Sequence, residues 1–361
     1  MRWCAVGNTA QGRQGYRECG CAGAAGAGRS HFRLAEGGVA RKLPRMNRRE
    51  FLVTTSAAVS LGFLARGALF GQTSPVTPAT PKATATTPPI AATRFQELRR
   101  GVGYFAGRGG TIGWLANRDG LLMVDTQFPE TATKFLDGLP GRDGRPLDVV
   151  INTHHHWDHT AGNATVRPVA RQIVAHEAVP ALQQAAAARS PNMGAPTLPD
   201  ATFAATWRVE LGDEVVQARH FGAAHTAGDS VVHFERANVV HVGDLVFNRV
   251  YPVTDKAGGC GVRSWIGVLE QVARAYPADT LFIFGHANPR FPVSGSSADV
   301  LAMRDFLTAL VEHVQAEIKA GKAKAEIVTL QNLPGFPDHH AQQNSRLPVN
   351  LGVVFDELTG V

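Results

Sequence analysis

The sequence predicts a mixed α/β fold. Short apolar runs typical of buried strands alternate along the chain with longer amphipathic stretches typical of helices. No repeat of solenoid period is present, so the chain is not a stacked array. Several of the apolar runs end in one or two small residues and then a His or Asp, which predicts polar groups gathered at strand ends.

The individual elements follow from these patterns. Strands are expected near residues 111–117, 121–125, 147–152, 171–175, 214–220, 230–234, 238–243 and 281–285. Helices are expected near residues 130–138, 177–189, 263–276 and 296–320. A two-sheet sandwich with outer helices can hold the ~270 residues of 94–361 as one domain.

The most informative motif is the run THHHWDHTAGN, which begins at Thr153. It follows the apolar stretch 147–152, and its small polar end suits a turn into a helix. Four side chains with metal-ligand chemistry fall within six residues: His154, His156, Asp158 and His159. Imidazole and carboxylate groups are the ligands that zinc or iron centres use, so the motif predicts a metal site.

Three further candidate ligands lie downstream, each beside an apolar run. His225 lies in the small-residue loop GAAHTAGD, Asp244 follows the run VVHVG, and His286 follows LFIFG. Strand ends that converge on one edge of a sheet build a single site from distant positions. These residues are therefore expected to join the first motif.

The order of motifs, HxHxDH, then HTxG, GD and GH, resembles the metallo-β-lactamase superfamily across roughly residues 102–291. The resemblance implies a four-layer αββα sandwich with a dinuclear metal site on one edge. It implies one metal held by His154, His156 and His225, and a second held by Asp158, His159 and His286. Asp244 would bridge the two, and Asp125 would orient a ligand imidazole as a partner behind the ligands.

The implied chemistry is metal-dependent hydrolysis of a small molecule with two Zn²⁺ ions. Two metals about 3.5–4 Å apart share a bridging hydroxide and bind substrate oxygens. Asp158 would be the catalytic carboxylate, as a metal ligand that also aims the nucleophile. An ester, lactone, thioester or amide is the expected substrate bond.

Two alternatives stay open. A strict β-lactamase is one, although the resistance enzymes of this fold carry Cys or Ser where this chain has Asp244. A mononuclear iron persulfide dioxygenase is the other, with Fe held by a subset of the ligands, His154, His225 and Asp244.

The loop 248–262 is expected to contact substrate through Tyr251 and Asp255. His155 and Trp157 are expected to point into the fold or to line the mouth of the pocket.

The segments before residue 94 do not resemble parts of a fold. Residues 1–45 are rich in Gly, Ala and Arg and are expected to be a misplaced or disordered leader. Residues 46–72 begin MNRREFL and continue into a small-residue apolar stretch, which resembles a twin-arginine export signal. Residues 73–93 are dense in Thr, Pro and Ala and are expected to be a linker. A periplasmic or otherwise exported domain, residues 94–361, follows from this partition, with a membrane tether if the signal is not cleaved.

Charge and cysteine content agree with that partition. The whole chain carries a net charge of +6, but residues 73–361 hold 25 basic and 27 acidic side chains. The basic excess therefore lies in the leader, and net charge gives no support for nucleic-acid binding. Cys260 is the one cysteine after residue 45, so residues 46–361 cannot form an intrachain disulfide.

Replacing both Arg48 and Arg49 with Lys should leave the precursor in the cytoplasm, because twin-arginine export reads the arginine pair. Cell fractionation and immunoblotting would measure the fraction exported, with Arg66→Lys as the control within the same segment. Unchanged export of the double variant would contradict the assignment of residues 46–72.

Overall fold

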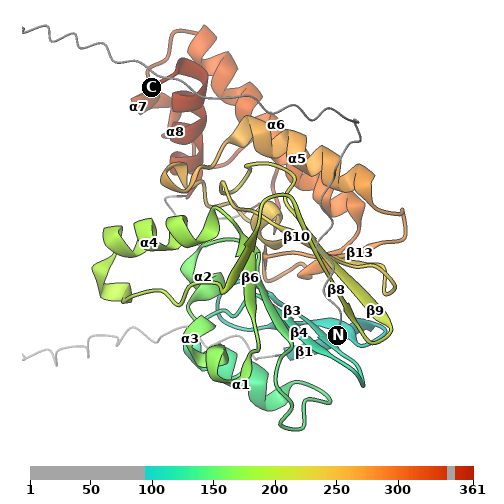
Figure 1. Ribbon diagram of the computed structural model, residues 1–361. Helices are drawn as coiled ribbons and strands as arrows, with labels where there is room; N and C mark the ends of the chain where they lie inside the picture. The colour runs from blue at the N-terminus through green and yellow to red at the C-terminus, as the bar shows by residue number, and fades with distance from the viewer. Residues whose placement is uncertain (1–93, 340–345) are drawn as a thin grey trace, which may run out of the picture. The chain divides into compact units, whose positions relative to one another are not determined.

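The computed structural model describes residues 94–339 and 346–361. The predicted leader, export signal and linker, residues 1–93, lie outside this part of the chain. Two sheets form the centre of the domain, and helices lie on both outer sides (Figure 1). The result is the four-layer αββα sandwich that the motifs imply.

The first sheet has seven strands in sequence order. β1 to β4 are antiparallel, and β4 to β7 are parallel. The strands are β1 (Arg94–Arg99), β2 (Val102–Ala106), β3 (Ile112–Ala116), β4 (Leu121–Val124), β5 (Val149–Asn152), β6 (Ile173–His176) and β7 (Ala201–Phe203).

The second sheet has six strands in the order β15-β13-β11-β10-β9-β8, and a separate two-stranded sheet pairs β12 with β14. Within the larger sheet only β11 and β13 are parallel. The strands are β8 (Thr206–Leu211), β9 (Glu214–Arg219), β10 (Val231–Phe234), β11 (Val239–His241), β12 (Phe247–Asn248), β13 (Leu281–Ile283), β14 (His286–Ala287) and β15 (Ser294–Gly295).

Eight helices complete the described part of the chain. Figure 1 shows α1 and α3 on the outer side of the first sheet, and α5 and α6 on the outer side of the second. The helices are α1 (Pro129–Gly138), α2 (Trp157–Thr160), α3 (Asn163–Val166), α4 (Val179–Arg189), α5 (Val262–Ala275), α6 (Ser297–Lys319), α7 (Lys324–Ile327) and α8 (Arg346–Thr359). No helix in the described ranges is long and apolar enough to span a membrane.

Alternation along the strands creates three hydrophobic layers. On β4, Leu122 and Val124 face the second sheet, whereas Leu121 and Met123 face the α1 side. On β10, Val232 faces the first sheet and Val231 faces the α5 side. Because successive strand side chains point to opposite faces, each sheet buries both of its faces. This accounts for the nearly continuous apolar runs that predict these strands.

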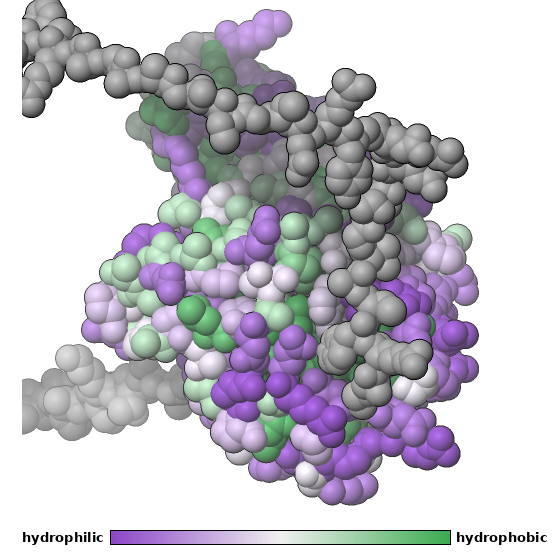
Figure 2. Space-filling view, in the orientation of Figure 1, coloured by the Kyte–Doolittle hydropathy of each residue, from purple (hydrophilic) through white to green (hydrophobic). Residues whose placement is uncertain are grey.

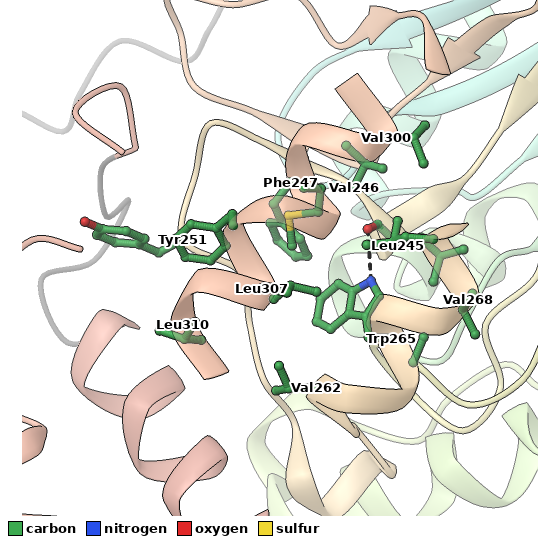
Figure 3. Packing of buried hydrophobic residues seen from close by; sticks show 14 of the residues in the cluster. Leu245, Val246, Phe247, Tyr251, Val262, Trp265, Val268, Val300, Leu307 and Leu310 are labelled. Atoms are coloured by element: carbon green, nitrogen blue, oxygen red, sulfur yellow. Dashed lines mark hydrogen bonds between the residues drawn. The ribbon is translucent and has the colours of Figure 1, made fainter. Parts of the chain in front are cut away.

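The third layer is the cluster under α5 and α6. Trp265 of α5 is fully buried there, and its Nε1 donates a hydrogen bond to the backbone oxygen of Leu245 at 3.0 Å (Figure 3). Leu245 directly follows Asp244. The packing of α5 against the second sheet therefore fixes the backbone on which Asp244 stands.

The open edge of the second sheet carries charge. Arg208 and Glu210 are exposed on β8, and they form a 2.8 Å ion pair. Figure 2 shows hydrophilic residues dominating the surface on the side of the domain where β8 and β9 lie. Charged side chains on an edge strand discourage pairing with another chain.

Backbone hydrogen bonds join the two sheets at one end. The amide of Thr111, before β3, donates to Gly285 O after β13 at 2.9 Å. The amide of Ser230, before β10, donates to Thr153 O after β5 at 2.8 Å. These bonds hold the ends of strands from both sheets together at the edge where the predicted ligands lie.

The predicted elements are all present, and no boundary differs by more than two residues. Other elements are not predicted by the apolar patterns, among them β1 and α8. β1 has the burial pattern of an edge strand with no fully buried residue, so it gives no apolar run. α8 buries Leu347, Leu351 and Val354 at helical spacing, but Gly352 in its interior weakens the prediction of a helix.

Trp265→Ala should lower the free energy of unfolding by about 3–5 kcal/mol, because it leaves a cavity under α5 and α6. It also leaves the Leu245 carbonyl without its donor. Guanidinium denaturation followed by circular dichroism would measure the change. Arg263→Ala, exposed on the same helix, is the matched control and should change stability by less than about 0.5 kcal/mol. Equal stability of the two variants would contradict this account of the cluster.

Candidate metal centre

All seven predicted ligand residues lie on the joined edge, in segments that follow a strand. Parallel pairing explains this, since β4 pairs with β5 and β11 pairs with β13, and parallel strands end at the same edge. His154 and His156 follow β5, Asp158 and His159 lie on α2, and His225 lies between β9 and β10. Asp244 follows β11, and His286 begins β14.

The first group consists of three imidazoles. His156 Nδ1 lies 3.1 Å from His154 Nε2 and 2.9 Å from His225 Nε2. Asp244 Oδ2 closes the group at 3.4 Å from His225 Nε2 and 3.8 Å from His154 Nε2. One atom from each of these four residues thus faces a common point, and all four atoms lie within 4.8 Å of one another.

The second group contains Asp158, His159 and His286. Asp158 Oδ2 lies 3.2 Å from His286 Nε2 and 3.9 Å from His159 Nε2. Asp244 also faces this group, with Oδ1 3.0 Å from His159 Nε2 and Oδ2 3.4 Å from His286 Nε2. The carboxylate of Asp244 therefore lies between the two groups.

Hydrogen bonds on the far side of the rings fix which nitrogen carries the proton in the first group. His225 Nδ1 donates to the Val253 carbonyl at 3.0 Å, and His156 Nε2 donates to Asp255 Oδ2 at 3.1 Å. Thr153 Oγ1 donates to Asp125, so it accepts from His154 Nδ1 at 2.9 Å. Each neutral ring has one N–H, so the three nitrogens that face one another carry lone pairs.

Converging lone pairs repel unless a cation lies among them. In the second group, the facing atoms His159 Nε2 and Asp244 Oδ1 are buried without a hydrogen-bond partner. Buried polar atoms without partners are rare in native proteins and point to an ion or a water molecule. Imidazole nitrogens and carboxylate oxygens suit Zn²⁺, so both groups fit a metal ion.

The electrostatic environment prepares the first group for a cation. Burial lowers the pKa of His225 to about 3 and holds the pKa of His154 well below its ordinary value. Burial would raise the pKa of Asp244, but the imidazoles of His159 and His286 outweigh it and hold that pKa well below its ordinary value. Neutral imidazoles and an ionised carboxylate are the forms that bind metals.

The carboxylates have the opposite effect on the second group. Burial disfavours a charged His286, yet Asp244 and Asp158 together raise its pKa to about 9. Burial likewise opposes ionisation of Asp158, while His159 and His286 hold the pKa of Asp158 below its usual range. The second group thus places two ionised carboxylates where positive charge is stabilised.

Two glycines allow the backbone to approach this cluster. A Cβ on Gly285 would lie 1.9 Å from Asp244 Oδ1, and a Cβ on Gly110 would lie 2.0 Å from His159 Cε1. Real Cβ atoms do not come that close to other atoms, so only glycine fits at either position. The sequence pattern GH marks Gly285, whereas nothing in it distinguishes Gly110 from its glycine neighbours.

The sequence model of the Metallo-beta-lactamase superfamily matches residues 106–286, half of the chain. The chain belongs to the metallo-β-lactamase superfamily. All seven candidate ligands lie within the matched range, and His286 is its last residue.

Three curated proteins are similar to this chain over part of their length. A hydroxyacylglutathione hydrolase of Cereibacter sphaeroides is 31% identical over 50% of this chain and 68% of its own. One of Chromohalobacter salexigens is 27% identical over 49% of this chain and 64% of its own. The alpha subunit of 2,4-dinitroanisole O-demethylase of Nocardioides sp. is 29% identical over 36% of this chain and 38% of its own. The chain thus spans less than two thirds of the length of the Chromohalobacter and Nocardioides proteins.

Solved structures support the metallo-β-lactamase fold. A metallo-beta-lactamase from Pontibacter korlensis superposes with a TM-score of 0.50 at 19% identity, over 60% of this chain and 99% of that one. A double mutant of the sec-alkyl sulfatase PisA1 superposes with a TM-score of 0.58 at 16% identity, over 74% of this chain and 50% of that one. At these identities the likeness concerns the fold alone.

The structure corrects the prediction for Tyr251. Its side chain is 2% exposed and lies in the hydrophobic cluster (Figure 3). Its ring lies 5.8 Å from that of Phe306. Tyr251 is therefore a packing residue and not the substrate contact that its loop position suggests. Asp255, from the same loop, lies beside the first group and contacts His156 and His155.

Asp125 lies where the sequence predicts a partner to an imidazole. Its Oδ2 accepts from His159 Nδ1 at 2.7 Å and from Thr153 Oγ1 at 2.7 Å, and its Oδ1 accepts from the Thr153 amide at 2.7 Å. Through Thr153 it also reaches His154. The role of Thr153 is missed by sequence reasoning, because a threonine before a histidine is not a recognisable signal.

Asp125→Asn should lower the free energy of unfolding by about 1–3 kcal/mol, measured by denaturation in the presence of a chelator. The amide has one acceptor oxygen in place of two, so either His159 Nδ1 or the Thr153 amide loses its partner. Asp137→Asn, exposed on α1, is the matched control and should leave stability unchanged. If the two variants are equally stable, Asp125 is not needed to satisfy these buried donors.

Proposed function

We propose that this chain is a dinuclear zinc-dependent hydrolase that cleaves an ester, lactone, thioester or amide bond in a small molecule. The observation that carries the proposal is the position of Asp244 between the two ligand groups, 3.4 Å from His225 and 3.0 Å from His159. A carboxylate shared in this way is suited to bridge two metal ions. The first ion would be held by His154, His156 and His225, and the second by Asp158, His159 and His286.

Two zinc ions would supply a bound water molecule with a pKa of about 7. They would also supply a Lewis acid that polarises the bond to be cleaved. The residues of the chain must bind the substrate beside the metal ions and orient that water molecule. Asp158 is suited to the second task because its side chain is 31% exposed and its carboxylate is ionised. One of its oxygens faces His286 at 3.2 Å, which leaves the other free to accept a hydrogen bond.

The exposure of the seven side chains indicates where substrate enters. Asp158, His156 and His286 are 31%, 18% and 12% exposed, whereas the other four are at most 3% exposed. Substrate therefore approaches from the side of α2 and β14. Trp157, partly exposed at the start of α2, lies on this side.

A thioester is the first substrate bond to test. Two of the curated relatives are named hydroxyacylglutathione hydrolase, and an acyl group on the glutathione thiol is a thioester. Lactones, other esters and amides share the same tetrahedral reaction course. A β-lactam belongs in the same panel, since the strict β-lactamase alternative rests on cleavage of a cyclic amide.

The iron dioxygenase alternative would use His154, His225 and Asp244 alone. Against it stands His156, whose Nδ1 faces the other two imidazoles at 3.1 and 2.9 Å. A lone pair directed at the same point is suited to a fourth ligand bond. The three-imidazole group therefore favours zinc hydrolysis, and metal analysis distinguishes the two functions.

We also propose that the enzyme acts outside the cytoplasm, in the periplasm or tethered to the membrane through its signal segment. Support for this comes from the arginine pair Arg48 and Arg49 and from the Thr- and Pro-rich residues 73–93. The substrate would then be a small molecule that reaches that compartment.

Asp244→Ala should remove at least one metal equivalent and most of the hydrolytic activity, because both ligand groups lose a shared carboxylate. Elemental analysis of the purified chain, paired with hydrolysis of thioester, lactone, phosphodiester and β-lactam substrates, measures both effects. Asp213→Ala, which changes an exposed aspartate in the turn between β8 and β9, is the control and should retain two zinc ions and full rate.

An Asp244→Ala variant with two metals and full rate would exclude the bridging role. About one iron per wild-type chain, with oxygen consumption on glutathione persulfide and no hydrolysis, would replace the proposed function with the dioxygenase.

A further inference from the structure

The loop 251–255 supplies two of the acceptors that set the first ligand group. The carbonyl of Val253 accepts from His225 Nδ1 at 3.0 Å, and Asp255 Oδ2 accepts from His156 Nε2 at 3.1 Å. These bonds direct the lone pairs of both rings toward His154. The loop therefore determines the tautomer and the orientation of two of the three imidazoles.

The same loop is held from its other side by α8. Asn350 Nδ2 donates to the Pro252 carbonyl at 2.9 Å and to Thr254 Oγ1 at 3.1 Å, and its side chain is fully buried. One turn earlier, Arg346 Nη1 donates to the Tyr251 carbonyl at 3.1 Å. From Pro252 to Asp255, residues that bond to α8 thus alternate with residues that bond to the imidazoles.

α8 also holds the chain beyond the loop. Glu357, at the other end of α8, accepts from the amides of Val262 and Arg263 at 2.9 and 3.1 Å, which anchors the start of α5. Between these anchors, Lys256 lies 3.5 Å from Asp356 of α8. The whole segment 251–263 is therefore attached to one helix that lies outside the family match at 106–286.

The carboxylate of Asp255 is fixed in place. A Cβ on Gly258 would lie 2.3 Å from Asp255 Oδ2 and 2.7 Å from the ring of His155. The backbone oxygen of Asp255 accepts from the amides of Gly258 and Cys260, each at 3.0 Å. Tight packing and these turn bonds leave the carboxylate directed at His156, so it is not a freely rotating surface group.

We propose that Asp255 and Asn350 are positioning residues of the metal centre, and that α8 holds the loop that sets His156 and His225 for one of the two metal ions. The inference rests on the proposed function, since it assigns these residues to the metal of the three-imidazole group. A carboxylate or carbonyl behind a ligand imidazole orients the ring and raises its basicity. Asp255 does this directly, and Asn350 does it through the backbone of the loop.

The effect should be confined to one metal. His159 and Asp158 contact neither the loop nor α8 through any hydrogen bond in the described residues, and His159 has its own partner in Asp125. Loss of Asp255 or Asn350 should therefore weaken the metal of the three-imidazole group and leave the other nearly unchanged. A purely structural role for α8 would lower stability without this selectivity.

The experiment is zinc competition with a chromophoric chelator on the zinc-loaded full chain, carried out on Asp255→Asn and Asn350→Leu. Asp255→Asn replaces one carboxylate oxygen with an NH₂ group and removes the negative charge. Asn350→Leu keeps a similar volume while removing both donated bonds. Each should weaken one zinc equivalent by about 10–100-fold, the usual effect of losing such a partner. The second equivalent should change by less than about twofold.

Val349→Ala is the matched control, because Val349 precedes Asn350 on α8 and is 50% exposed. Its two zinc affinities should equal those of the wild type. Circular dichroism and denaturation of each variant separate a loss of folding from a loss of metal. If Asn350→Leu does not fold, Asp255→Asn alone carries the test.

Two outcomes overturn the inference. Wild-type affinity for both zinc ions in Asp255→Asn and in a folded Asn350→Leu would reduce α8 to a structural role, while the proposed hydrolase would stand. A wild-type chain that binds no zinc would overturn the proposed function and this inference together.

Discussion

The structure depends on one buried carboxylate that is surrounded by imidazoles. Asp244 lies within 3.8 Å of ring nitrogens from His154, His159, His225 and His286, and it is 3% exposed. An isolated buried carboxylate would cost several kcal/mol, so it must be paired. The imidazoles of His159 and His286 stabilise its charge, whereas His154 and His225 direct lone pairs toward it. Placing four rings around one carboxylate requires strand ends from both sheets to meet at one point. The bonds from Thr111 to Gly285 and from Ser230 to Thr153 provide that meeting.

A second set of contacts makes the arrangement specific for metal. Behind the rings, Asp125, Thr153, Val253 and Asp255 each take the N–H that would otherwise face the centre. Asp125 does so with φ at +62°, a conformation that aspartate tolerates better than most residues. Strain of this kind persists where the surroundings fix it, and three short hydrogen bonds fix Asp125.

The sequence predicts the strands that lead into the site because each is buried on both faces and so reads as an apolar run. It predicts the candidate ligands because side chains of ligand type follow those runs. It does not identify Val253, whose backbone oxygen acts regardless of side chain, or Asn350, whose partners lie about 100 positions away. Tyr251 shows the limit of arguing from loop position, since its ring packs against Phe306 of α6 in the hydrophobic cluster.

The candidate metal ligands and the helix that holds the loop behind them come from different parts of the chain. All seven candidate ligands lie within residues 106–286, whereas α8 begins at Arg346. His154 and His159 are held by Thr153 and Asp125, which lie within the matched residues 106–286. The loop 251–255 is different, because its other side is bonded to a helix beyond the shared domain. Under our proposal, changes in α8 alter the affinity for one metal ion without changing any ligand, and this scaffold is tuned by that route while its reactive groups stay constant.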